Sequence, residues 1–132
     1  MAKNKTTIAP HYTKVGRIGL SISRKANIPA ADIYISDNHL EHIKLQHGKD
    51  LSRLGFTANE FVNVVVGSFD QIRKGSGQSL LLVVYNEELL KVAAIELNYS
   101  LKKRFWEIKT ATPMRVTALG SKSLIWQRER TP

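Results

Sequence analysis

The sequence predicts an α+β fold, in which two helices in the N-terminal half pack on a C-terminal antiparallel β-sheet of four to five strands. Helix caps and stops occur within residues 36–67, whereas apolar runs of strand length, separated by turns, follow from residue 70 onward. The length of 132 residues suits one domain. We expect residues 1–14 to form a flexible basic arm and residues 15–132 to form a single domain.

The first half of the chain begins with weak strand patterns and then contains a helix. Val15–Ile22 alternates apolar and polar residues, which favours a strand, and Ile33–Ile35 is a second short strand or a lead-in to the helix. Ser36 is among the candidate N-caps, and Gly48 is a candidate stop. These residues predict a helix over about residues 38–47.

A second helix is predicted from a capping box. Thr57 is followed three residues later by Glu60, the spacing at which each side chain can cap the backbone of the other. The valine-rich segment behind it would suit a strand, but the cap and the glycine at Gly67 favour a short buried helix.

The second half of the chain predicts a series of strands. Turn-forming residues separate them, and Pro113 is expected to interrupt the series because it cannot donate a ladder hydrogen bond. The predicted strands are Leu80–Tyr85, Val92–Leu101, Phe105–Thr112, Arg115–Leu119 and Leu124–Arg128.

Composition excludes several classes of protein. The chain has no cysteine, which excludes disulfide scaffolds, thiolate zinc sites and cysteine nucleophiles. No apolar run approaches the roughly 18–20 residues that span a bilayer. The basic N-terminus leads into no hydrophobic signal segment. We therefore expect a cytoplasmic protein with no membrane partner.

The formal net charge of +9 is unevenly distributed along the chain. Residues 1–25 carry +6, residues 26–101 carry −3 and residues 102–132 carry +6. Such asymmetry favours a surface that binds a polyanion, although a charge that serves only solubility or assembly is the alternative. The predicted nucleic-acid contacts are Lys102, Lys103, Arg104, Lys122, Arg128 and the stacking face of Trp126.

Three histidines lie within nine residues of the first predicted helix. His47 falls on the apolar stripe with Leu40, where it is either a packed core residue or an imidazole suited to acid–base chemistry near neutral pH. His39 and His42 could face one ion, but no third ligand stands at a familiar spacing. We therefore expect no metal and no cofactor.

The late strand offers a second group of candidate residues. Alternation places Trp106, Ile108 and Thr110 on one face, with Thr110 near a rim of the sheet. A hydroxyl at that position, beside Lys109 and Arg115, could hold a phosphate through hydrogen bonds and charge. The alternative is that the threonine is an ordinary strand residue.

Two segments together resemble a known family. His42–His47 resembles the His-Ile-x-x-x-His helix of phage-associated barnase–EndoU–colicin–RelE-like (BECR fold) nuclease domains, and Trp106–Ala111 resembles the late strand of that family, which carries a Thr-Ala pair. The resemblance covers roughly residues 33–128. One position departs from the pattern, since Gln46 stands where members commonly have a basic residue before the second histidine.

The resemblance implies a phage-encoded or toxin-like, metal-independent ribonuclease. In such enzymes the ribose 2′-OH attacks the adjacent phosphate and leaves a 2′,3′-cyclic phosphate. His47 would then be the leading acid–base residue and His42 a second, Thr110 would orient the phosphate, and Lys109 or Arg115 would stabilise the developing charge. This chemistry needs a proton shuttle and fixed cations.

The expected partner is therefore an RNA substrate, and a toxin would also need an acidic inhibitor that covers the basic surface. The alternative function is a non-catalytic nucleic-acid-binding module that uses the same cations.

Overall fold

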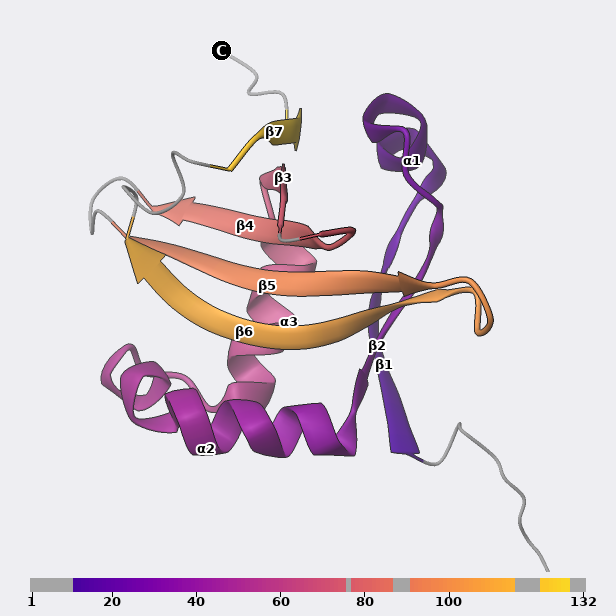
Figure 1. The fold of residues 1–132 in the computed structure, drawn as a ribbon. Helices are drawn as coiled ribbons and strands as arrows, with labels where there is room; N and C mark the ends of the chain where they lie inside the picture. The colour runs from indigo at the N-terminus through magenta and orange to yellow at the C-terminus, as the bar shows by residue number, and fades with distance from the viewer. Residues whose placement is uncertain (1–10, 76, 87–90, 116–121, 129–132) are drawn as a thin grey trace, which may run out of the picture.

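The computed structural model describes residues 11–75, 77–86, 91–115 and 122–128 (Figure 1). They form three helices and one seven-stranded sheet with the order β1-β2-β6-β5-β4-β3-β7. Neighbouring strands are antiparallel except for β2 and β6, which are parallel. The elements in chain order are β1 (Tyr12–Ile18), α1 (Leu20–Ala26), β2 (Ala31–Ser36), α2 (Asp37–Arg53), α3 (Ala58–Ser68), β3 (Gln71–Lys74), β4 (Leu80–Asn86), β5 (Lys91–Ser100), β6 (Phe105–Arg115) and β7 (Leu124–Gln127).

The predicted architecture is wrong in its number of helices and strands and in its purely antiparallel sheet. The α+β structure has three helices where two were predicted, and a mixed seven-stranded sheet where an antiparallel sheet of four to five strands was predicted. The N-terminal strands β1 and β2 join the C-terminal strands in one sheet, so the helices are not segregated before it. Pairing between segments about 70 residues apart, as in Ile33 opposite Trp106, leaves no local pattern in the sequence.

The segment predicted as one strand from Val15 to Ile22 changes structure at Gly19. β1 ends at Ile18 and α1 follows, closed by Asn27 in the left-handed conformation with φ of 57°. Tyr12 to Lys14, at the end of the predicted arm, belong to β1, and residues 1–10 of that arm lie outside the described residues.

Helix α2 is longer than the predicted helix. Ser36 is its N-cap, and its side chain accepts a hydrogen bond from the His39 N–H, but the helix continues through Gly48 to Arg53. Burial of Leu51 in the core favours this extension against the cost of about 1 kcal/mol for a helical glycine. The glycine that follows the helix end is Gly55, whose φ of +87° is the left-handed conformation typical of that position.

Helix α3 begins at the predicted capping box. The Thr57 hydroxyl accepts from the Glu60 N–H at 3.1 Å, and the Thr57 N–H donates to the Glu60 carboxylate at 2.9 Å. The two bonds satisfy backbone groups that the first helical turn leaves free. Prediction of this helix start from its sequence pattern is confirmed.

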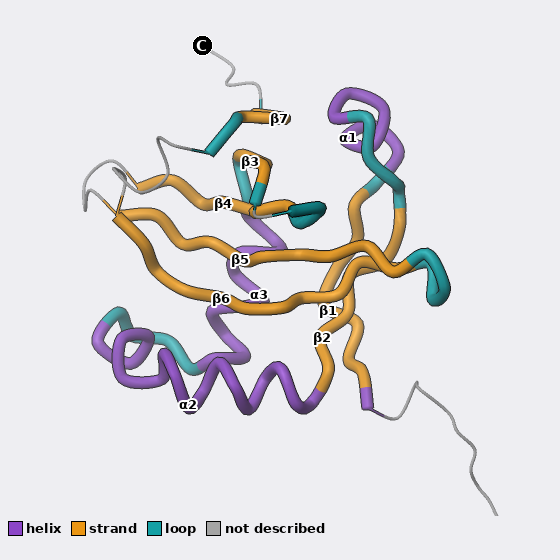
Figure 2. Tube along the Cα trace, in the orientation of Figure 1, coloured by secondary structure: helices purple, strands orange, loops and turns teal. Residues whose placement is uncertain are grey.

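Helices α2 and α3 form the layer that packs on the sheet (Figure 2). α2 lies along β6, whereas α3 contacts β1, β4 and β5. α1 contacts β7, the strand at the opposite sheet edge from β1. Within the described ranges, no helix has the length and apolarity that crossing a membrane requires.

A β-bulge in β6 changes which side chains face the core. Glu96 of β5 lies opposite Thr110, and the next residue, Leu97, lies opposite Ile108, so Lys109 is the extra residue. The prediction that Thr110 shares a face with Ile108 is therefore wrong, because Ala111 takes the core-facing position instead.

Pro113 does not interrupt the ladder between β5 and β6, which continues to Arg115. β2 pairs with β6 only at Trp106 and Glu107, so β6 is a sheet edge at Pro113. A proline is compatible with an edge strand because its missing N–H can face away from the neighbouring strand. The predicted strand from Arg115 to Leu119 falls mostly on residues 116–121, outside the described residues.

Close packing of β1 on α3 explains the glycine at Gly16. A Cβ atom added there would overlap Cγ1 of Val66, a buried residue of α3. We predict that Gly16→Ala lowers the free energy of unfolding, measured by urea denaturation, by about 1–3 kcal/mol, because the core must accommodate the added methyl.

The matched control is Gly67→Ala in α3, where an added Cβ meets open space. This change should leave stability unchanged or raise it by up to about 1 kcal/mol, because alanine is the better helix former. Val66→Ala should cost less in the Gly16→Ala background than in the wild type. Equal stability of Gly16→Ala and the wild type would contradict the packing explanation.

Candidate active site

A buried carboxylate, Glu107 of β6, lies at the centre of a cluster of polar side chains. Its side chain is 11% exposed. Glu107 Oε2 accepts a hydrogen bond from the Tyr12 hydroxyl at 3.2 Å and lies 3.5 Å from His39 Nδ1. Glu107 Oε1 lies 3.6 Å from Lys109 Nζ and 4.0 Å from Lys103 Nζ. We call these five residues the Glu107 cluster.

The sheet topology brings this cluster together from distant parts of the chain. β2 pairs with β6 at Tyr34 opposite Glu107, and α2 starts directly after β2. The first turn of α2, which carries His39, therefore lies beside Glu107. Tyr12 comes from β1, on the other side of β2, and Lys103 comes from the turn between β5 and β6.

Aromatic rings pack beside the cluster and hold Lys103. The Phe105 ring lies 5.3 Å from the Tyr12 ring and 4.5 Å from the Tyr34 ring. Lys103 Nζ lies 4.6 Å from the centre of the Tyr12 ring and donates a hydrogen bond to the Tyr12 hydroxyl at 2.6 Å. That bond raises the pKa of Lys103. A hydrogen-bonded chain therefore runs from the Lys103 ammonium through Tyr12 to Glu107.

The imidazole of His39 is held through its Nδ1 atom. Ser36 Oγ lies 2.7 Å from Nδ1 and also accepts the His39 backbone N–H at 3.1 Å. Within the part of the chain that the structure describes, Nε2 has no hydrogen-bond partner. Nε2 is therefore the ring atom available for proton transfer.

Burial is the main factor that lowers the pKa of His39 below its ordinary value. The ammonium of Lys109 lowers it further, the carboxylate of Glu107 raises it, and His42 contributes a smaller lowering. A neutral imidazole at neutral pH can act as a proton acceptor.

The cluster combines a buried anion with more accessible groups. Lys103, His39 and Lys109 keep 26%, 31% and 35% of their side-chain surface exposed, compared with the 11% of Glu107. An anionic ligand can therefore reach the two ammonium groups and the imidazole more readily than the carboxylate. Two cations beside a neutral histidine can hold a phosphate and move a proton.

The structure brings some of the predicted catalytic residues to this cluster. Lys109 is a member. His42 is exposed on the next turn of α2 and acts electrostatically on His39. His47 is half-buried eight residues beyond His39, a separation of about 12 Å along the helix axis at 1.5 Å per residue. It has no hydrogen bond or ion pair with any described residue.

The two remaining catalytic candidates follow the bulge in β6. Thr110 is half-buried and lies opposite Glu96 of β5. The backbone of Arg115 pairs with Lys91, but the side chain of Arg115 lies outside what the structure describes. Thr110 is next to Lys109 in sequence, on the other side of the bulge from Glu107.

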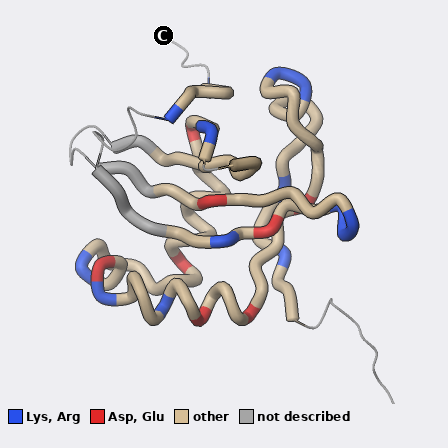
Figure 3. The backbone as a smooth tube through the Cα atoms, viewed as in Figure 1, with Lys and Arg blue, Asp and Glu red and all other residues tan. Residues whose placement is uncertain are grey.

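The predicted nucleic-acid-binding residues divide between two places. Lys102 and Arg104 are exposed in the turn between β5 and β6, on either side of Lys103 of the cluster (Figure 3). Arg104 has a φ of 61°, which completes this tight turn. These cations form a basic rim next to the candidate site.

The other three predicted contacts lie around β7, at the far edge of the sheet. Trp126 is half-buried against Phe69, with 5.7 Å between the ring centres. Arg128 donates to the Phe69 carbonyl at 3.0 Å and lies 5.6 Å from the centre of the Trp126 ring. The carbonyl of Lys122 accepts from Arg73 at 2.8 Å. These three residues therefore make packing or backbone contacts within the protein.

Sequence reasoning did not identify Glu107 or Tyr12 and considered His39 only as a metal ligand. The sequence did contain one signal for His39. It lies three residues after the N-cap Ser36, a spacing that brings the serine hydroxyl and the imidazole together. Tyr12 carried no such pattern, because it meets Glu107 only through the sheet. Among the described residues, no group of three His, Asp or Glu side chains is arranged to hold a metal ion.

No known protein family, curated protein or solved structure matches the chain. The resemblance to BECR-fold nucleases, which depends on two short motifs, stays a prediction.

The environment of His39 predicts a titration that NMR can follow. In the wild type, the pKa of His39 should lie below the ordinary 6.5. Lys109→Met should raise it, because removal of the ammonium makes protonation easier while burial persists. Glu107→Gln should lower it further, because the neutral amide no longer attracts the imidazolium.

The control for the loss of a positive charge is Lys44→Met. Lys44 is an exposed residue of α2 that pairs with Glu41 at 3.3 Å, and its replacement should leave the pKa of His39 unchanged. A wild-type value at or above 6.5, or no response to Lys109→Met, would contradict the electrostatic description of the cluster.

Proposed function

We propose that the protein is a metal-independent ribonuclease whose active site is the Glu107 cluster. The observation that carries the proposal is the meeting of His39, whose pKa burial lowers, with the ammonium groups of Lys103 and Lys109 around one buried carboxylate. Transfer of a phosphoryl group within RNA needs a proton acceptor, a proton donor and fixed positive charge, and this set supplies all three.

In the proposed reaction, His39 Nε2 accepts the proton of a ribose 2′-OH as the 2′ oxygen attacks the adjacent phosphorus. The bond from phosphorus to the 5′ oxygen then breaks, leaving a 2′,3′-cyclic phosphate on one fragment. The 5′ oxygen leaves with a proton, which the imidazolium or the Lys103–Tyr12 hydrogen-bonded chain can donate. Lys109 and Lys103 offset the negative charge that develops on the phosphate oxygens.

Glu107 serves as a positioning residue in this proposal. With 11% of its side chain exposed and partners on both oxygens, the carboxylate holds Tyr12 and the two lysines in place. Removal of this anion would leave like charges close together, so activity should depend on Glu107 even though the substrate does not touch it.

The proposal moves the main acid–base role from His47 to His39, and cleavage assays can test it. Purified protein with labelled mixed RNA and excess EDTA should yield fragments ending in a 2′,3′-cyclic phosphate. His39→Ala should lower the rate about 100-fold or more, the usual contribution of acid–base catalysis. Lys109→Met should lower it about tenfold or more, because one phosphate-binding charge is lost.

The matched controls are His47→Ala on the same helix and Lys44→Met on its exposed face. Both should keep near-wild-type cleavage, and all variants should show similar melting temperatures. If His47→Ala loses cleavage and His39→Ala keeps it, the main acid–base residue is His47 and not His39. Intact RNA after hours with folded wild-type protein, with or without added metals, would contradict the ribonuclease proposal.

The alternative is a nucleic-acid-binding module without catalysis, which the exposed Lys102 and Arg104 beside the cluster favour. It predicts RNA affinity that falls steeply with salt and is kept by His39→Ala. As a ribonuclease, the protein would act on cytoplasmic RNA and, if it is a toxin, would require an acidic inhibitor over this basic rim.

A further inference from the structure

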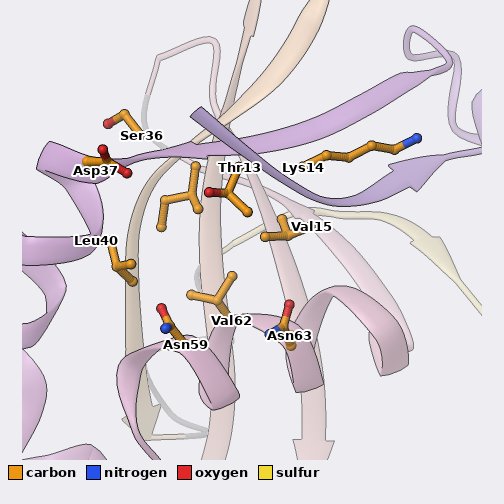
Figure 4. A pocket seen from close by; sticks show the side chains of 10 residues that line it. Thr13, Lys14, Val15, Ser36, Asp37, Leu40, Asn59, Val62 and Asn63 are labelled. Carbon is orange, nitrogen blue, oxygen red and sulfur yellow. The ribbon is translucent and has the colours of Figure 1, made fainter. Parts of the chain in front are cut away.

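A separate cavity of about 330 Å³ opens between β1 and the two long helices (Figure 4). Four apolar side chains form its base. Ile35 of β2 and Val62 of α3 are 3% and 1% exposed, and the half-buried Val15 and Leu40 lie beside them. The volume is at the low end of the range for sites that bind small molecules. The cavity therefore suits one flat group of modest size.

Four of the polar side chains that line this cavity have no hydrogen-bond or ion-pair partner among the described residues. They are the side chains of Thr13, Asp37, Asn59 and Asn63. Asn59 and Asn63 lie one turn apart and extend from α3 towards β1, whereas Lys14 extends away (Figure 4). Two amides, a hydroxyl and a carboxylate are thus available to a ligand.

The cavity adjoins the Glu107 cluster through shared and neighbouring residues. Ser36 lines the cavity and also hydrogen-bonds His39 Nδ1 at 2.7 Å. Tyr12 and Thr13 are consecutive in β1, so their side chains leave opposite faces of the strand, and the cavity is connected to the cluster through Ser36 and the first turn of α2. A chain held at the cluster by a phosphate can therefore present an adjoining group to the cavity by passing the start of α2.

We propose that this cavity binds a nucleobase that carries an exocyclic amino group, and that it selects adenine, cytosine or guanine over uracil. The proposal rests on the proposed ribonuclease function for its biological role but can be tested without any cleavage. The half-buried side chains of Val15 and Leu40 would pack against the flat ring, and the amides of Asn59 and Asn63 can both donate to and accept from its edge.

Asp37 provides the discrimination. An ionised carboxylate only accepts hydrogen bonds, so it requires a donor from the base. Adenine, cytosine and guanine each carry an exocyclic amino group that can donate to it, whereas the one ring donor of uracil, N3–H, lies between two carbonyl oxygens that the carboxylate repels.

The test is an NMR titration of the wild-type protein with AMP, CMP, GMP and UMP, following the side-chain amide signals of Asn59 and Asn63. The three amino-bearing nucleotides should shift these signals and bind at least tenfold more tightly than UMP, as expected for one well-placed base contact. Asn63→Ala should weaken binding of the three, because one amide is lost.

Asp37→Asn should reduce the preference over UMP to less than threefold, because an amide can also donate to uracil carbonyls. The matched control is Asp50→Asn, an exposed α2 carboxylate that pairs with Arg53 at 3.6 Å, and it should keep the preference. Equal binding of UMP in the wild type, no shift of either asparagine, or an unchanged preference in Asp37→Asn would overturn the inference.

The two proposals fail separately. Selective nucleotide binding by a protein that leaves RNA intact would contradict the ribonuclease proposal but support the base-binding cavity. Cleavage to cyclic phosphates by a protein whose asparagine signals do not respond to any nucleotide would support the ribonuclease and overturn the cavity.

Discussion

Burial of the Glu107 carboxylate is the constraint on which the candidate site depends. Removing a charge from water costs several kcal/mol unless partners compensate for it. Glu107 obtains those partners from β1, from the first turn of α2, from the β5–β6 turn and from its own strand. The same contacts that stabilise the anion therefore tie together segments that are far apart in the sequence, and they hold two lysines and a histidine in one place.

The short parallel pairing of β2 with β6 makes this arrangement possible. The two strands pair at only two positions, after which the chain enters α2, which lies along β6. The start of α2 consequently serves two sites. His39 reaches the Glu107 cluster, Asp37 lines the neighbouring cavity, and Ser36 contacts both. In the two proposals, cleavage chemistry and base selection share this one helix start.

Elements with a strong local pattern were predictable, whereas those that depend on distant contacts were not. The capping box at Thr57 identified the start of α3 because the two reciprocal bonds form within four residues. Gly48 did not end α2, because the buried Leu51 beyond it favours continuation of the helix. Strict alternation failed in β6 because the bulge at Lys109 adds one residue opposite β5, a feature of strand register that the β6 sequence alone does not encode.

From the sequence alone it follows that the chain is strongly basic and lacks cysteine, that three of its four histidines lie in one predicted helix, and that Lys109 lies in the late strand. Which of these residues meet depends on the way the sheet and helices pack. Glu107 reads as a surface carboxylate in an alternating strand, yet the sheet encloses it and brings Tyr12 and His39 to it. The physical reason is that charge and composition are properties of each residue, whereas burial and pKa depend on neighbours that the sheet topology supplies.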